Sequence, residues 1–424
     1  MSDTSRSSKT EIQPDEMDKA IAQARIEILL LFILYLFILP RVYMDYDMGF
    51  WRSWALEIHR NGLGATYNST INYFPVYIYG LYIYDWLQGT EANIALHINN
   101  IKILFIIFDF LPVIVLCCFR QKILSFKIPH LFLLINIAYV FNSMIWGQID
   151  SIYTNLAFLA IVTGILYPVP GMLLYLLALN TKQQAIEFLP IMGIVLLYSV
   201  RSFKTVVLGG ISVVVLQVVL LLPFLGNGGA GKLLTIAGNT VGLYHNLSIC
   251  AFNIWYLIAK GNPYFINDTD TYFILSFRVI GLALFAIAAL LLFIPMLKKV
   301  LYIRKNNLPF DTKAYESLFL ATGMLCLYFF YFNTQMHERY AHPIIIFFFF
   351  YGVVSKNYKL YILASIPYLL SLDKCSSFPD GYLPVVHYKI IYASKAIAIW
   401  YTVTVVYGSC LFVKLMRQPE VINR

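Results

Sequence analysis

The chain has 424 residues, of which 60% are hydrophobic and only 12% are charged, and its mean hydropathy is +0.70. These values exceed those of an ordinary soluble domain. The formal net charge is +9, but no basic surface interleaved with aromatic residues stands apart from the apolar runs, so we expect no nucleic-acid partner. We predict an all-α, polytopic transmembrane protein with the lipid bilayer as its main partner.

The first 26 residues are polar, and the apolar run that follows lacks a small-residue cleavage site, so we predict a cytoplasmic tail over residues 1–26. Apolar runs then recur from Ile28 to Val413. One crossing of the hydrocarbon core takes roughly 20 apolar residues as a helix, which gives about twelve spans. We therefore expect one transmembrane domain over residues 27–416 and a second cytoplasmic tail over residues 417–424.

The segments between the apolar runs differ in charge. The basic ones, together with both tails, hold most of the Lys and Arg and are expected in the cytoplasm, which requires an even number of spans. These basic segments are "FRQKILSFK", "VRSFK", "LKKVLYIRKNNLPFDTK" and "SKNYK". The outer side then receives the long first loop (residues 44–98), "WGQID", "NTKQQ", "GNGGAGK", "NTQMHERYAHP" and "LDKCSSFPDGYLPVVHY".

The first outer loop contains an amphipathic pattern between Met48 and Arg60, which ends at Asn61-Gly62. This pattern predicts a helix that lies along the membrane interface with its tryptophans at headgroup depth. Asp45 and Asp47 precede it. Each is either a helix N-cap or a general base at the mouth of a membrane cavity, and composition does not decide between the two.

The six cysteines show no CxxC spacing, so we predict neither a zinc site nor a disulfide framework. No HExxH, Walker A, GxSxG or EF-hand pattern occurs, which leaves a protease, an ATPase or a calcium module without support. We predict no cofactor and no metal, although Asp45 with Asp47 could bind an ion weakly.

Six motifs nevertheless follow one another along almost the whole chain: "YDMGFWRSWALEI", "NYFPVYIYG", "WGQIDSIYT", "NTKQQAIEFLP", "LSICAFNIWYL" and "FNTQMHERYAHP". In this order they resemble the motifs of the GT-C integral-membrane glycosyltransferases. The likeness is greatest to mannosyltransferases related to the second mannosyltransferase of GPI-anchor synthesis. It is weaker to the lumenal glucosyltransferases of asparagine-linked glycosylation. One departure is "NYFPVY", where the family usually has a second Pro and often an acidic residue.

The resemblance implies a polyprenyl-phosphate-dependent hexosyltransferase, with mannose the favoured sugar. It would act on a glycan, lipid or protein acceptor at the outer or lumenal face and would invert the anomeric centre. The family's catalytic base matches Asp47, which lies seven residues before Trp54, and Asp45 is the alternative. We favour a bacterial plasma membrane, with the endoplasmic reticulum membrane as the alternative.

Inverting transfer needs a base, donors for the leaving phosphate and a groove for the lipid chain. We predict that His337, Arg339 and Lys182 bind the donor phosphate. Glu338 would support them by pairing with a cation. Predicted acceptor or sugar contacts are Asp45, Asp150, Tyr73, Trp146 and Gln183. Asp150 could instead support Lys182 or cap a span.

Two other functions fit the same composition. A secondary transporter would place its site near the bilayer midplane and often shows internal repeats. No motif is duplicated between the halves of this chain, and the polar clusters fall on one side of the predicted membrane. A non-catalytic subunit of a membrane glycosylation complex would keep the fold without the base, and the presence of Asp47 argues against it.

Overall fold

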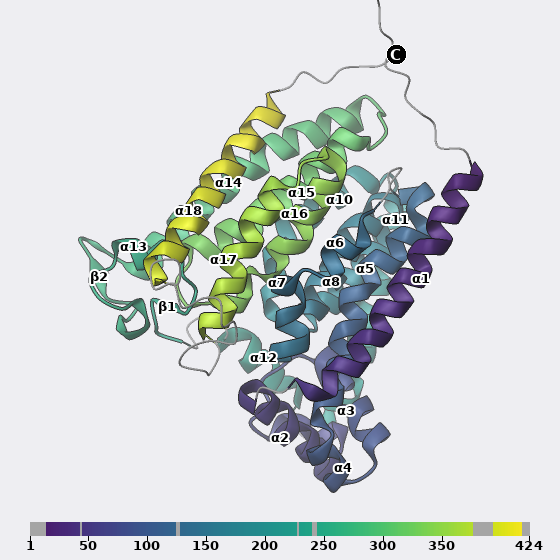
Figure 1. Ribbon diagram of the computed structural model, residues 1–424, viewed down its shortest axis with the longest axis vertical. Helices are drawn as coiled ribbons and strands as arrows, with labels where there is room; N and C mark the ends of the chain where they lie inside the picture. The colour runs from purple at the N-terminus through teal and green to yellow at the C-terminus, as the bar shows by residue number, and fades with distance from the viewer. Residues whose placement is uncertain are drawn as a thin grey trace, which may run out of the picture.

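The structure is a computed structural model that describes residues 14–42, 45–123, 128–226, 229–239, 244–375 and 393–417. The described chain is mostly helical, as the composition predicts, and forms an elongated bundle (Figure 1). Its strands are short: β1 (Ser248–Ile249) pairs in parallel with β4 (Met336–His337), and β2 (Thr271–Tyr272) pairs antiparallel with β3 (Leu275–Ser276).

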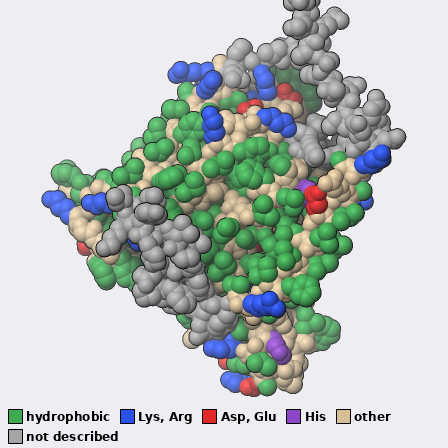
Figure 2. All heavy atoms as spheres, viewed as in Figure 1, with side chains coloured by type: hydrophobic (Ala, Val, Ile, Leu, Met, Phe, Trp, Pro, Cys, Tyr) green, Lys and Arg blue, Asp and Glu red, His purple; other side chains and the backbone are tan. Residues whose placement is uncertain are grey.

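Among the described residues, six helices are long and apolar enough to cross a membrane. They are α1 (Pro14–Ile38), α5 (Lys102–Ile123), α11 (Phe203–Leu221), α14 (Phe277–Lys305), α15 (Thr312–Phe332) and α18 (Ser394–Met416). The expectation of about twelve spans is therefore wrong. Hydrophobic side chains cover the middle of the face shown in Figure 2, with charged side chains toward its ends and edges.

The other apolar runs form helices that are too short. They are α8 (Asp150–Leu166), α9 (Pro168–Leu179), α10 (Leu189–Ser199), α16 (His342–Ser355) and α17 (Lys359–Cys375). The 17 residues of α8 reach roughly 25 Å, less than the hydrocarbon thickness of about 30 Å. The run breaks at Tyr167 because Pro168 has no backbone N–H to continue the helix, and α9 begins there. A run of apolar residues that contains such a break looks like a full span in the sequence, which is why the expected number of spans was too high.

Short elements connect the helices. In chain order they are η1 (Leu39–Arg41), η2 (Leu63–Asn68), η3 (Ile98–Ile101), α6 (His130–Leu134), α7 (Ile137–Val140), the π-helical turn η4 (Phe141–Trp146), η5 (Gln183–Phe188), η6 (Leu222–Phe224), α12 (Gly229–Asn239), α13 (Trp255–Ile258), η8 (Pro263–Phe265) and η9 (Glu338–Ala341).

Helices α8 and α16 form the centre of the bundle, and almost all their side chains are buried. Phe158 of α8 packs against Phe319 of α15 and against Phe347 and Phe350 of α16, with ring centroids 5.9, 5.6 and 4.5 Å away. At the periphery, α1, α11 and α14 expose many large apolar side chains. This distribution is typical of helices that face lipid rather than water.

The first loop folds at one end of the bundle as α2 (Asp45–Asn61), α3 (Pro75–Gln88) and α4 (Glu91–Leu96), whereas α1 begins and α18 ends at the other end (Figure 1). The tryptophans of α2, which were expected at headgroup depth, are covered by protein. Trp51 and Trp54 are 2% and 7% exposed and pack against Tyr73, each 5.3 Å from its ring. The buried face of α2 therefore packs on protein.

The aromatic cluster around Phe158 provides a test of this core. We expect Phe158→Ala to destabilise the protein by about 3–5 kcal/mol, because truncation leaves a cavity among three other rings. Thermal unfolding in detergent measures the loss. Phe203→Ala is the matched control, because Phe203 is 80% exposed. Equal melting temperatures for the two variants would contradict this description of the core.

Candidate functional site

The segment between α15 and α16 is a buried break between two helices. Helix α15 ends at Phe332, and α16 restarts with Pro343 in its first turn. Between them, β4 pairs with β1 so that His337 lies opposite Ile249. Turn η9 follows, and Glu338 is only 1% exposed. The charged motif that sequence reasoning placed in an outer loop is therefore enclosed by protein.

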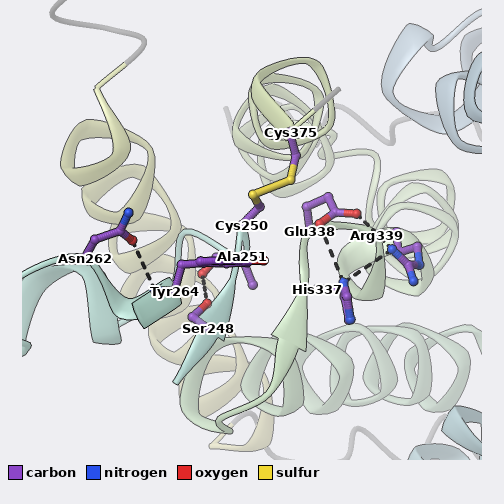
Figure 3. Close-up of a disulfide and its surroundings, with 9 residues drawn as sticks. All are labelled: Ser248, Cys250, Ala251, Asn262, Tyr264, His337, Glu338, Arg339 and Cys375. Atoms are coloured by element: carbon purple, nitrogen blue, oxygen red, sulfur yellow. Dashed lines mark hydrogen bonds and ion pairs between the residues drawn. A yellow bond between two sulfur atoms is a disulfide. The ribbon is translucent and has the colours of Figure 1, made fainter. Parts of the chain in front are cut away.

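Arg339 bonds to two other residues of this motif, Glu338 and His337. Its Nη1 donates to Glu338 Oε1 at 3.2 Å and to His337 Nδ1 at 3.4 Å (Figure 3). Because a guanidinium can only donate, Nδ1 is the acceptor, and the proton of the neutral imidazole is on Nε2. Burial and the charges of Arg339 and Lys182 hold the pKa of His337 well below its usual value. At neutral pH His337 is therefore an uncharged donor.

Two donors of this motif point at no acceptor. His337 Nε2 and Arg339 Nε are buried and make no hydrogen bond within the described part of the chain. A buried N–H without an acceptor costs free energy, which an oxygen-rich ligand would recover. The pKa of Glu338 is raised by burial, although the neighbouring Arg339 opposes that shift.

Lys182 forms a second buried ion pair beside this motif. Its Nζ lies 2.6 Å from Asp150 Oδ1, and both side chains are buried. The Lys182 ammonium is also 4.9 Å from the ring centroid of Tyr340, and the guanidinium of Arg339 is 5.7 Å from the same ring. Tyr340 thus contacts both cations. Asp150 pairs with Lys182, which is one of the three roles considered for it from the sequence.

Asp47 lies in the first turns of α2 and is 9% exposed. Trp146 Nε1 donates to its Oδ2 at 2.5 Å, and Gln148 Nε2 donates to the same oxygen. Trp51 Nε1 donates to the carbonyl of Gly147 at 2.8 Å, which fixes α2 against this segment. The side chain of Asp45 lies outside the described residues, although its backbone begins α2.

The fold brings most of the predicted site residues together. The charge of Asp47, in α2, acts on Lys182, which directly precedes η5, and on Glu338 and Arg339, which both lie in η9. Tyr73 also interacts with Asp47 and Arg339. Gln183 is engaged elsewhere, since its Nε2 donates to the carbonyl of Ala237 in α12 at 2.8 Å. Trp146 holds Asp47, so its indole N–H is not available to a sugar.

No known protein family matches this chain, and a search of curated proteins found no match.

Asp268 and Arg278, which no sequence pattern singled out, hold the segment before His337 in place. The buried carboxylate of Asp268 accepts two hydrogen bonds from Arg278 at 2.8 Å each. It also accepts from Thr334 Oγ1 at 2.9 Å and Gln335 Nε2 at 2.7 Å. Asp268 and Thr334 are far apart in sequence, so no spacing pattern indicated this contact.

The prediction that the cysteines form no disulfide is wrong. Cys250, after β1, is bonded to Cys375 at the end of α17, and the bond lies beside Glu338 (Figure 3). The two cysteines are 125 residues apart, and only the fold brings their Cα atoms to 6.0 Å. Their sulfurs and the Glu338 carboxylate lie within 4.8 Å of one another. While the disulfide is intact, neither sulfur is a thiolate that could bind a metal.

The buried pair of Lys182 and Asp150 gives a stability prediction. We expect Asp150→Asn to cost about 3–5 kcal/mol, because it leaves the buried ammonium without its partner. Adding Lys182→Met should restore much of the loss, as measured by thermal unfolding in detergent. Glu91→Gln, which breaks the exposed pair with Arg60, is the control and should leave the melting temperature unchanged. No rescue by the second substitution would contradict the pairing.

Asp268 gives a pH prediction. Burial raises its pKa, but hydrogen bonds from Arg278, Gln335 and Thr334 outweigh burial and hold the pKa below the usual 3.8. A lowered pKa in the folded state means that the carboxylate stabilises the protein above pH 3.8 and that this contribution disappears as the pH falls through the folded value. Asp268→Asn should lower stability at pH 7 and flatten the acid limb of unfolding. Asp270→Asn, at an exposed position, should do neither.

Proposed function

We propose that this protein is a membrane glycosyltransferase that moves a hexose, with mannose favoured, from a polyprenyl-phosphate donor to an acceptor hydroxyl with inversion. One observation carries the proposal. The buried carboxylate of Asp47 shares a cluster with three nitrogen donors, those of Lys182, His337 and Arg339. A carboxylate base and a set of phosphate donors are the two parts that this reaction requires. The six motifs that resemble GT-C enzymes support the same reaction.

Asp47 would serve as the base. Its orientation is fixed by the bonds from Trp146 and Gln148 to Oδ2. As the acceptor oxygen attacks the anomeric carbon, its proton passes to the carboxylate. The bond from that carbon to the phosphate oxygen breaks, and its electron pair leaves with the polyprenyl phosphate. The products are the glycoside with inverted configuration and the free lipid phosphate.

The leaving phosphate would be bound by the cations and by His337. The two donors without acceptors, His337 Nε2 and Arg339 Nε, are available to phosphate oxygens. Lys182 and Arg339 are now balanced by Asp150 and Glu338, so a phosphate adds negative charge to a buried cluster that holds no excess of cations. Glu338, whose pKa burial raises, is suited to take up a proton when the phosphate binds.

A transporter is the second candidate, because of one buried carboxylate away from this cluster. Asp109 lies within α5, where Ser143 donates to it and Asn155 Nδ2 lies 3.4 Å from its Oδ1. Ionisable residues inside spanning helices often mark ion or substrate pathways. Solute uptake into proteoliposomes that is lost in Asp109→Asn and kept in Asp47→Asn would favour transport over transfer.

The base assignment is tested by Asp47→Asn. We expect turnover to fall by about 10²–10⁴-fold, because the amide cannot accept the proton. Binding of the donor should persist, because the three nitrogen donors are intact. The assay follows transfer from a synthetic polyprenyl-phosphate mannose to acceptor lipids by mass spectrometry, with donor binding measured separately. Glu57→Gln on the same helix is the control and should keep full activity. If Asp47→Asn turns over as fast as the natural protein, Asp47 is not the base.

A further inference from the structure

The hairpin of β2 and β3 carries the most exposed large apolar side chains in the described part of the chain. Phe273 and Ile274 form its two-residue turn and are 87% and 91% exposed. In Figure 1 the hairpin projects from the edge of the bundle beside α13. Helix α14 starts at Phe277, directly after the hairpin.

This turn is unfavourable in water for two separate reasons. Phe273 has φ +60, a left-handed conformation that two-residue hairpins normally give to Asn, Asp or Gly. Two large apolar side chains are also left uncovered, and within the described residues the ring of Phe273 contacts one other ring, that of Tyr272 at 4.7 Å. A polar turn would fold with less strain, so the residues present are better explained by a contact outside the chain.

The base of the hairpin is held in place by ring packing, a backbone hydrogen bond and an ion pair. Tyr272 stacks on Phe277 at 5.2 Å, over a small apolar cluster of Leu247, Trp255 and Phe277. The backbone N–H of Phe277 donates to the carbonyl of Asp270 at 3.1 Å, and the Asp268–Arg278 pair closes the base. The turn is therefore held away from the bundle by a packed base.

Elements close to the hairpin in sequence also expose large apolar side chains. On α14, Val279 and Leu282 are 47% and 51% exposed, and Phe265 of η8 is 81% exposed. Helix α14 is long and apolar enough to cross a membrane. We propose that Phe273 and Ile274 insert into the headgroup–acyl boundary of the bilayer beside the first turn of α14, and that this hairpin is an interfacial anchor.

A bilayer fits this surface better than a protein partner does. A stable protein interface buries about 800 Å² on each side around a packed centre. The turn offers two side chains at its tip, next to a helix that is apolar without interruption from Val279 to Ile294. Burial in lipid offsets the exposure of both side chains without a complementary pocket.

Spin labels test the depth of the turn. The full chain is prepared with Cys118→Ser and Cys410→Ser, labelled at Ile274→Cys or, as the control, at Asp270→Cys, and placed in lipid nanodiscs. Power saturation compares collisions with oxygen, which partitions into lipid, and with a water-soluble nickel chelate. We expect oxygen to dominate at residue 274 and the nickel chelate to dominate at residue 270. Nickel dominance at 274 overturns the proposal. A label at 274 shielded from both reagents also overturns it, because a protein surface would then cover the turn.

A second variant separates anchoring from folding. Replacing the turn with Gly-Asn (Phe273→Gly with Ile274→Asn) relieves the strain, because only position 273 has a positive φ and glycine adopts it freely, so the melting temperature in detergent should stay the same or rise. On transfer from detergent to nanodiscs, we expect the natural protein to gain more thermal stability than this variant. Equal gains would contradict the anchor.

Discussion

The candidate site depends on one interaction: each of its two buried cations is paired with a carboxylate. Two cations, Lys182 and Arg339, are buried between helices, and each has a carboxylate partner, Asp150 at 2.6 Å and Glu338 at 3.2 Å. Removing such charges from water is costly, so each partner is needed to keep its cation in place. The ring of Tyr340 lies near both cations and attracts them through cation–π interactions. The segments that carry these residues are therefore fixed relative to one another.

Hydrogen bonds and a disulfide fix the positions of the segments around this cluster. Asp268 holds the residues before β4, and the Cys250–Cys375 disulfide joins the segment after β1 to α17. On the opposite side, Trp146 and Gln148 fix the Asp47 carboxylate. An acid–base site requires such rigidity, because reacting groups that are misplaced by an ångström lose much of their rate.

The predictions from the sequence agree with the structure for features that the residue types alone determine. The helical class follows from composition, and the end of α2 at Asn61 follows from the Asn-Gly that tolerates the φ of +77 at Gly62. The predictions disagree with the structure for features that depend on adjacent residues or on packing partners. About twelve spans were expected, but the described residues contain six, because Pro168 and similar breaks divide apolar runs into short helices. The tryptophans of α2 pack on Tyr73.

By itself the sequence determined that this chain is apolar and mostly helical, and it singled out Asp47, Lys182, His337, Glu338 and Arg339 as charges that require an explanation. Those conclusions rest on transfer free energies, which belong to individual residues. Only the tertiary structure decided that these charges meet, that Asp150 pairs with Lys182, that Gln148 donates to Asp47, and that Cys250 reaches Cys375. These contacts join residues 32 to 125 positions apart, and their distance is set by helix packing, which no local sequence pattern records.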